Sequence, residues 1–292
     1  MVIEVTTAIK IDDLWVRYRE EEDYAIKGLS LRIEEGEFIL LMGPSGCGKT
    51  TLCLTIMGII PRVIKAEVKG NVRIFDVNPL NASPTEIAKY VTIVFQNPEM
   101  QLVTTSVYEE VAFPLENFGL PQDEIKRRVK EVLDIVGLSG LEDRSPASLS
   151  GGQKQALAIA SVLALRPKII ILDEPTSQLD PQGTKRVTDL ILKLRREFET
   201  TILAVEHRIE WAVEHVDRIV VMNDGRIILE GDPKTIFSKE IKPEKSGFRP
   251  PQVSEIAYYL IKSGVTLPTI PISLNEALNI FKGILDEKAA HS

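Results

Sequence analysis

Residues 43–50 read Gly-Pro-Ser-Gly-Cys-Gly-Lys-Thr, which matches the pattern G-x-x-x-x-G-K-[ST]. Glycines in such a loop let backbone N–H groups come close to an anion, with the positive end of a following helix behind them. The stretch therefore suits nucleotide phosphates, with Lys49 reaching the β- and γ-phosphates and the Thr50 hydroxyl ligating Mg²⁺. The residues expected to line the nucleotide are Gly43, Pro44, Ser45, Gly46, Cys47, Gly48, Lys49, Thr50 and Thr51.

Two adjacent carboxylates offer a second kind of chemistry. Asp173 and Glu174 end an apolar run over residues 168–172 that is typical of a buried central strand. Side chains at the carboxyl end of such a strand lie in the crevice where open α/β sheets bind ligands. Asp173 is expected to hold Mg²⁺, directly or through water, and Glu174 to polarise a water for in-line attack. The alternative, two exposed turn acids, fits poorly behind so many aliphatic residues.

A second anion site is predicted at residues 149–153, which read Leu-Ser-Gly-Gly-Gln. A serine and two glycines at the start of an alanine-rich helix bring free N–H groups and the positive helix end together. The candidate residues are Ser150, Gly152 and Gln153.

Three single residues could take part in chemistry, although a structural role is more common for each. Gln96 follows a buried run at 91–95, where an amide is more often a loop hydrogen-bonding group than a metal ligand. His207 follows another such run at 201–205, where a lone histidine is otherwise a packing or surface residue. Tyr18 ends the first strand, where an aromatic ring usually packs but can also stack on adenine.

The strands that must position these residues follow from hydrophobic patterning. Alternating residues at 9–18 and 29–34 predict an antiparallel N-terminal sheet. The apolar run at 38–41 predicts a buried strand before the phosphate loop, and a helix at 51–59 that Pro61 stops follows the loop. Further strands are predicted at 68–75, 91–95, 168–174 and 201–205, and a hairpin at 218–222 and 226–230.

Helices are predicted between and after these strands. Capping boxes begin helices at Ser83, Ser106 and Ser273. An apolar stripe over 125–136, ending at Gly137, indicates a helical subdomain inserted between strands. Other helices are predicted at 150–165, 182–197, 253–262 and 273–286, the last two after a proline-rich linker at 242–251. The final helix has an apolar face that packs on the main domain or on another copy.

Composition limits the function classes. The 292 residues are 44% hydrophobic and 26% charged, as in an ordinary globular protein. A net charge of -7 without a long basic run argues against nucleic acid as the main partner, although a local basic patch is not excluded. No membrane helix or signal peptide is recognised, and the only cysteines, Cys47 and Cys53, match neither zinc nor redox spacing. A cytoplasmic location is therefore expected.

The order of these motifs, with Ser-Gln-Leu-Asp at 177–180, resembles the ATP-binding-cassette (ABC) ATPases over about residues 9–231. The resemblance implies an α/β fold: a P-loop NTPase core with a mainly parallel sheet, an N-terminal antiparallel β subdomain and an inserted α-helical subdomain at about 97–165. It further implies an ATPase domain over 1–238. A linker and small C-terminal helical extension, which could serve dimerisation, would occupy 239–292.

The same resemblance implies roles for individual residues, with ATP and Mg²⁺ as cofactors. Gln96 would be a Mg²⁺ ligand and a lever to a partner, Glu174 the general base, and His207 the γ-phosphate sensor. Tyr18 falls where the family stacks an aromatic ring on adenine. Two cassettes would face head to tail, so that Ser150 and Gly152 touch the ATP held by the partner's Lys49, and one copy alone would be nearly inactive.

Small departures from the family pattern occur. Cys47 and Thr50 are tolerated variants of the loop, Gln178 replaces a small residue, and Glu206 and Arg208 flank the histidine in place of the commoner Thr and Asp. Because Glu206 and Arg208 differ from the common residues, the way in which His207 would contact the γ-phosphate stays open.

Residues 94–101 and 105–113 look like the ATPase subunit of energy-coupling-factor (ECF) importers, which take up vitamins or transition-metal ions. This implies a second cassette, identical or not, a transmembrane coupling protein and a substrate-binding membrane protein. The chain would lie peripherally on the cytoplasmic face of the cell membrane.

Alternative functions are an ATPase of another ABC importer or an exporter, a chromosome-maintenance ATPase and a non-enzymatic ATP-dependent clamp. Exporters are more often fused to their membrane part. Chromosome-maintenance ATPases need a very long coiled coil between Gly48 and Ser150, where only about a hundred residues lie. Intact Lys49, Glu174 and His207 argue against a clamp without catalysis.

Overall fold

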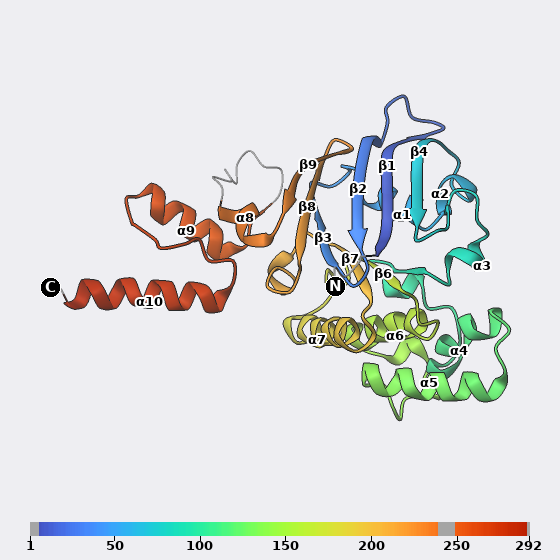
Figure 1. Cartoon of the computed structure of the whole chain (residues 1–292). Helices are drawn as coiled ribbons and strands as arrows, with labels where there is room; N and C mark the ends of the chain where they lie inside the picture. The colour runs from blue at the N-terminus through green and yellow to red at the C-terminus, as the bar shows by residue number, and fades with distance from the viewer. Residues whose placement is uncertain (1–5, 239–248, 291–292) are drawn as a thin grey trace, which may run out of the picture.

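The computed structural model describes residues 6–238 and 249–290 of the chain. A six-stranded sheet in the order β5-β6-β7-β3-β8-β9 forms its centre, with parallel pairing throughout except for the antiparallel pair β8 and β9 (Figure 1). The strands are β3 (Phe38–Met42), β5 (Val91–Val94), β6 (Ile169–Asp173), β7 (Thr201–Val205), β8 (Arg218–Asn223) and β9 (Arg226–Gly231). Because parallel strands end at the same edge, the residues after β3, β5, β6 and β7 converge.

A second sheet confirms the predicted antiparallel subdomain. It is three-stranded, in the order β2-β1-β4, and consists of β1 (Thr7–Tyr18), β2 (Ile26–Glu34) and β4 (Ala66–Ile74). Buried residues of this sheet, such as Ile9 and Leu29, form one hydrophobic cluster with Ile39 of β3 and Leu52 of the following helix. The two sheets therefore enclose α1, the helix that follows the phosphate loop.

That helix ends earlier than the sequence pattern predicts. Helix α1 spans Lys49–Ile56, and the chain then turns at Gly58 with φ 66 before the short helix α2 (Ile59–Arg62). A Cβ atom at Gly58 would lie 2.5 Å from the carbonyl oxygen of Pro79, so a close approach of two chain segments requires this glycine. The prediction that Pro61 ends the helix was wrong, because Pro61 lies within α2.

The predicted helical insertion is present below the main sheet (Figure 1). Its elements include η1 (Pro98–Met100), α4 (Val107–Asn117), α5 (Gln122–Val136), η2 (Pro146–Ser148) and α6 (Gly151–Leu163). The predicted capping box of Ser106 is confirmed, Ser150 forms another that the sequence analysis did not predict, and Gly137 ends α5 with φ 72. Helix α7 (Pro181–Phe198) packs on α6, and α3 (Pro84–Ile87) begins at Ser83, whose hydroxyl caps it.

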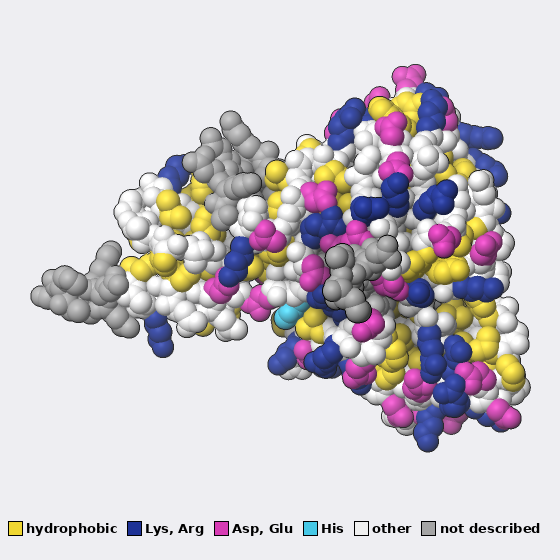
Figure 2. Space-filling model, in the orientation of Figure 1, with side chains coloured by type: hydrophobic (Ala, Val, Ile, Leu, Met, Phe, Trp, Pro, Cys, Tyr) yellow, Lys and Arg dark blue, Asp and Glu magenta, His cyan; other side chains and the backbone are white. Residues whose placement is uncertain are grey.

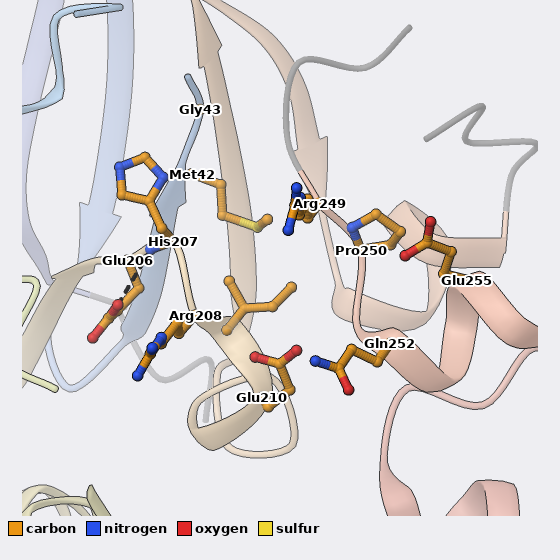
Figure 3. Close-up of a pocket in the computed structure, with 11 residues that line it drawn as sticks. Met42, Gly43, Glu206, His207, Arg208, Glu210, Arg249, Pro250, Gln252 and Glu255 are labelled. Carbon is orange, nitrogen blue, oxygen red and sulfur yellow. Dashed lines mark hydrogen bonds between the residues drawn. The ribbon is translucent and has the colours of Figure 1, made fainter. Parts of the chain in front are cut away.

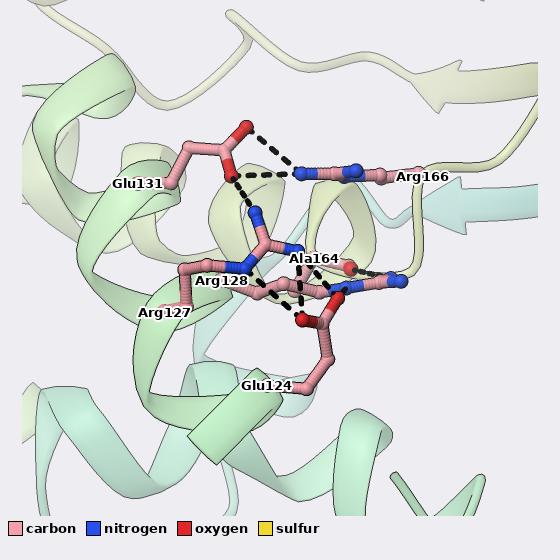
Figure 4. Close-up of polar contacts among 6 residues, drawn as sticks. All are labelled: Glu124, Arg127, Arg128, Glu131, Ala164 and Arg166. Carbon is pink, nitrogen blue, oxygen red and sulfur yellow. Dashed lines mark hydrogen bonds and ion pairs between the residues drawn. The ribbon is translucent and has the colours of Figure 1, made fainter. Parts of the chain in front are cut away.

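A charge network fixes α5 to the C-terminal end of α6 (Figure 4). The Arg128 guanidinium donates to Glu124 at 2.7 Å and to the carbonyl oxygen of Ala164 at 3.1 Å. Arg166 and Glu131 form an ion pair of 2.7 Å between the same two segments. Since a cation near a helix C-terminus satisfies its free carbonyls, the network holds α6 at the end opposite Ser150.

The C-terminal extension consists of α8 (Pro233–Ser238), α9 (Gln252–Lys262) and α10 (Leu274–Ala290). The last helix runs beyond the predicted end at residue 286. Most of the predicted linker at 242–251 lies outside the described residues, and the division of the chain at residue 238 stays a prediction. The Ser273 hydroxyl accepts from Glu276 N, but the Glu276 carboxylate accepts from Ile272 N, so the predicted capping box is displaced by one residue.

Hydrophobic side chains gather on the surface of this extension (Figure 2). The exposed apolar residues are Ile256, Tyr259, Ile261, Leu274 and Leu278. None of the described helices combines the length and apolar character needed to cross a membrane.

Candidate functional site

The phosphate loop connects β3 to α1, as its pattern predicts. At Gly43 a Cβ atom would lie 2.2 Å from the carbonyl oxygen of Met222, and Gly48 begins α1 with φ 107, so both positions require glycine. The Lys49 ammonium group lies across the loop and donates to the carbonyl oxygens of Gly43 and Pro44 at 2.8 and 2.9 Å. The cation is thus held inside the loop in which the phosphates were predicted to bind.

Asp173 lies opposite the start of α1. Its Oδ2 atom is 3.5 Å from the Thr50 hydroxyl oxygen, and its side chain is buried. Burial, and then the charge of Glu174, raises the pKa of Asp173. Within the described residues no group of three or more His, Cys, Asp or Glu side chains could hold a metal. One carboxylate and one hydroxyl nevertheless fit Mg²⁺, which usually takes its other ligands from water and substrate phosphates.

Glu174 lies at the centre of the predicted catalytic residues. Its Oε2 accepts a hydrogen bond of 2.7 Å from the Gln96 side-chain amide, and its Oε1 lies 3.3 Å from His207 Nε2. The backbone of Glu174 is left-handed, with φ 48, and its N–H donates to the carbonyl oxygen of Val205 at 2.9 Å. A non-glycine residue in this region costs about 1–2 kcal/mol, so the surrounding structure enforces the turn that presents the carboxylate.

The strand ends therefore bring together four of the predicted residues: Gln96, Asp173, Glu174 and His207. A carboxylate held between an amide and an imidazole can accept a proton from water, and an imidazole at this edge can hydrogen-bond a phosphate oxygen. A cavity of about 860 Å³ adjoins this edge and is lined by His207, Arg208, Arg249 and Gln252, among others (Figure 3).

Tyr18 lies close to the phosphate loop. Its hydroxyl is 2.9 Å from the Thr51 hydroxyl oxygen, which fixes the ring near the start of α1. A small cavity of about 360 Å³ lies beside Tyr18 and is lined by Arg17, Glu21 and Glu67 as well. Tyr18 therefore borders a cavity close to the phosphate loop, and its stacking on adenine stays a prediction.

The Ser150 group lies on a different element, the N-terminus of α6. The Ser150 hydroxyl accepts from Gln153 N at 3.3 Å, and the Gln153 side-chain oxygen accepts from Ser150 N at 3.0 Å. The first N–H groups of a helix have no partner within it, so those of Gly151 and Gly152 suit an anion. A separate cavity of about 470 Å³, lined in part by Gly152 and Arg186, adjoins this helix end.

One buried acid in this region has contacts that the sequence did not reveal. Glu206 is 2% exposed and accepts hydrogen bonds from Thr176 and Trp211. The sequence marked it only as an unusual neighbour of His207, because Thr176 lies 30 residues away and no motif includes Trp211.

A parallel sheet with a glycine-rich phosphate loop, and carboxylates at its strand ends, defines a P-loop nucleotide-hydrolysing protein. The model of the family described as ABC transporter matches residues 26–177. The chain belongs to this family, and it is an ATP-binding ATPase.

One relative is the energy-coupling factor transporter ATP-binding protein EcfA1 of Ligilactobacillus salivarius, 42% identical over 89% of this chain and 90% of the relative. Other relatives carry only the general name of an ABC transporter ATP-binding protein.

Among solved structures, CbiO1 of Clostridium perfringens, described as part of the ABC transporter complex CbiONQ, is 35% identical. The match has a TM-score of 0.72 and covers 86% of this chain and 99% of CbiO1. The ATP-binding cassette MJ0796, described as a dimer in a post-hydrolysis state with ADP and Pi, is 32% identical. That match has a TM-score of 0.65 and covers 77% and 98% of the two chains.

Proposed function

We propose that this chain is the ATP-hydrolysing subunit of an energy-coupling-factor importer for vitamins or transition-metal ions. The similarity to EcfA1 over 89% of the chain supports this class. The structural observation that carries the proposal is the hydrogen bond between the Gln96 amide and the Glu174 carboxylate. The segment that follows Gln96 exposes large apolar side chains, so this bond connects Glu174 to the segment that bears them. The proposed catalytic base is therefore linked to a surface that suits a partner protein.

That surface consists of Met100 and Val103, which are 81% and 68% exposed. The buried carboxylate of Glu110 holds their segment by accepting from Val103 N and Thr104 N, each at 2.9 Å. On its other side, Glu99 forms an ion pair with Lys154 of α6. A cytoplasmic helix of a membrane protein that docks here would contact a segment joined to both Glu174 and α6.

In the proposed reaction, Lys49 and the phosphate loop hold the ATP phosphates, and Glu174 takes the proton of the attacking water. His207 donates a hydrogen bond to the γ-phosphate, while Tyr18 stacks on adenine. Mg²⁺ bound by Thr50 and Asp173, with Gln96 as a further ligand, would supply charge that neutralises the phosphates. These residues act mainly by positioning and charge stabilisation.

The catalytic site is completed, in this proposal, by a second cassette that is either identical or a paralogue. Its Ser150, Gly152 and Gln153 contact the ATP bound by the first chain. The exposed apolar residues of α10, including Leu274 and Leu278, would add contacts between the two C-terminal extensions. Dimer closure driven by ATP would then be transmitted to the transmembrane coupling protein through the segment after Gln96.

The docking step is tested with Met100→Glu combined with Val103→Glu. Charges at both positions should abolish copurification with the membrane proteins encoded with this chain and the uptake of their small-molecule substrate. Val63, which is 71% exposed on α2's C-terminal side, gives a matched control, and Val63→Glu should keep both properties. Unchanged uptake in the double variant would refute this docking surface.

Reconstitution of the purified complex in proteoliposomes decides between importer and exporter. With ATP on the side of the cassettes, the proposal expects the substrate to move toward that side. Movement away from the cassettes would support the exporter instead.

A further inference from the structure

Glu206 has the most completely hydrogen-bonded buried carboxylate near the site. It follows β7 directly, precedes His207, and is 2% exposed. Its Oε1 accepts from the Thr176 hydroxyl at 2.8 Å, from Thr176 N at 3.3 Å and from Trp211 Nε1 at 3.1 Å. Its Oε2 accepts from His207 N at 3.2 Å, the contact drawn in Figure 3.

Three of these four contacts come from N–H groups, which can only donate, and the two carboxylate oxygens of Glu206 accept from all of them. Burial raises the pKa of Glu206 above its usual range, although the hydrogen bonds from Thr176 and Trp211 partly offset this effect. A buried carboxylate would be costly without such partners, which indicates that the network maintains a specific arrangement.

The network connects two segments of the proposed catalytic site. Thr176 begins the loop that follows Glu174, and the Ser177 hydroxyl donates to the carbonyl oxygen of Glu174 at 3.0 Å. The loop then leads into α7, where Asp180 caps the helix by accepting from Gly183 N at 2.6 Å. On the other side, Glu206 holds the backbone of His207, whose imidazole lies 3.3 Å from the Glu174 carboxylate.

We propose that Glu206 is a positioning residue for ATP hydrolysis, because its carboxylate fixes the loop after Glu174 relative to His207. This inference rests on the roles proposed above for Glu174 and His207. The loop at 177–180 has the sequence Ser-Gln-Leu-Asp, so the same carboxylate also orients the segment that leads into α7.

The test compares three variants of the full-length chain, together with its membrane partners. Glu206→Gln keeps the shape but replaces one acceptor oxygen with an NH₂ group that opposes a donor. It should lower kcat about 10-fold, the effect expected from the loss of one hydrogen bond to a charged group. KM for ATP should stay within about 2-fold. Thr176→Val should lower kcat in the same direction, and the double variant should be little worse than Glu206→Gln because the two residues act together.

Trp211→Phe is the control for a merely structural role. It removes a donor to the same oxygen that belongs neither to the loop after Glu174 nor to His207, so the thermal midpoint should fall while kcat stays within about 2-fold. An equal loss of kcat in Trp211→Phe and Glu206→Gln would overturn the inference, and so would unchanged kcat in folded Glu206→Gln. If Glu206→Gln does not fold, Thr176→Val decides: unchanged kcat overturns the inference.

A different result is expected if Glu174 and His207 do not have the catalytic roles proposed above. Full turnover in both Glu174→Gln and His207→Ala would refute the proposed catalytic residues themselves. Loss of turnover in those two variants, with normal kcat in Glu206→Gln, would refute only the positioning role of Glu206.

Discussion

Gln96 and Glu174 are 78 residues apart in sequence, and the Gln96 amide donates to the Glu174 carboxylate at 2.7 Å. The other oxygen of this carboxylate lies 3.3 Å from His207 Nε2. The acid is therefore held between a residue that leads to an exposed apolar surface and a residue at the end of β7. The two contacts together orient the Glu174 side chain.

Gln96→Ala should lower ATP turnover in the assembled complex about 10-fold, because it removes one hydrogen bond to a charged group that orients the base. ATP affinity should change little, since Lys49 and the phosphate loop are untouched. Steady-state hydrolysis and ATP titration measure the two effects. Gln101, on the same segment, accepts from Phe95 N and not from the catalytic residues, so Gln101→Ala is the control. Equal turnover in both variants would contradict the role of Gln96.

Glu174→Gln should keep ATP binding but lower kcat about 10²- to 10⁴-fold, the usual contribution of a general base. The amide preserves the size of the side chain but cannot take a proton from water. An ATP-bound dimer should therefore accumulate, which size-exclusion chromatography with ATP detects. Normal steady-state hydrolysis would remove Glu174 as the base.

Lys49→Ala should weaken ATP binding about 10- to 100-fold, because charge-assisted hydrogen bonds to phosphate contribute more than neutral ones. Equilibrium titration with a fluorescent ATP analogue measures the change. Lys65 is an exposed lysine whose ammonium group donates to the Arg62 carbonyl oxygen, and Lys65→Ala should leave the affinity unchanged. Equal affinities in the two variants would mean that the loop is only a turn.

Much of this site could be predicted from the sequence because the patterns that determine it lie within short stretches of the chain. The apolar runs before Gln96, Asp173 and His207 are short and continuous, which is typical of buried parallel strands. Parallel strands end at one edge, so the convergence of these residues follows from the pattern. The capping box at Ser106 is likewise set by residues three positions apart.

The remaining features depend on contacts between distant segments. The turn at Gly58 results from the close approach of Pro79, whereas the local pattern favours a continued helix. Glu206 accepts from Thr176, which lies 30 residues away in the sequence, and no local pattern connects the two residues. The position of Ser150 relative to a bound nucleotide depends on a second chain, so it stays a prediction.

The composite site is tested by mixing two inactive variants. Ser150→Arg fills the anion pocket at the start of α6, and Lys49→Ala disables the phosphate loop. In a mixed dimer, the loop of the arginine chain faces the intact Ser150 of the alanine chain, so one composite site is restored. Random pairing of equal amounts, with sites acting independently, should return about a quarter of wild-type activity, because half the dimers are mixed and each has one intact site.

Each variant alone should be inactive, because every dimer of identical variant chains has two defective sites. Ser139 is another exposed serine of the helical subdomain, and Ser139→Arg should keep activity, which separates the effect of position from that of added size and charge. ATP hydrolysis by each variant, by the control and by the mixture is measured at the same total chain concentration. High activity from Ser150→Arg alone would contradict the composite site, since a side chain of that size does not fit a pocket shared with a facing nucleotide.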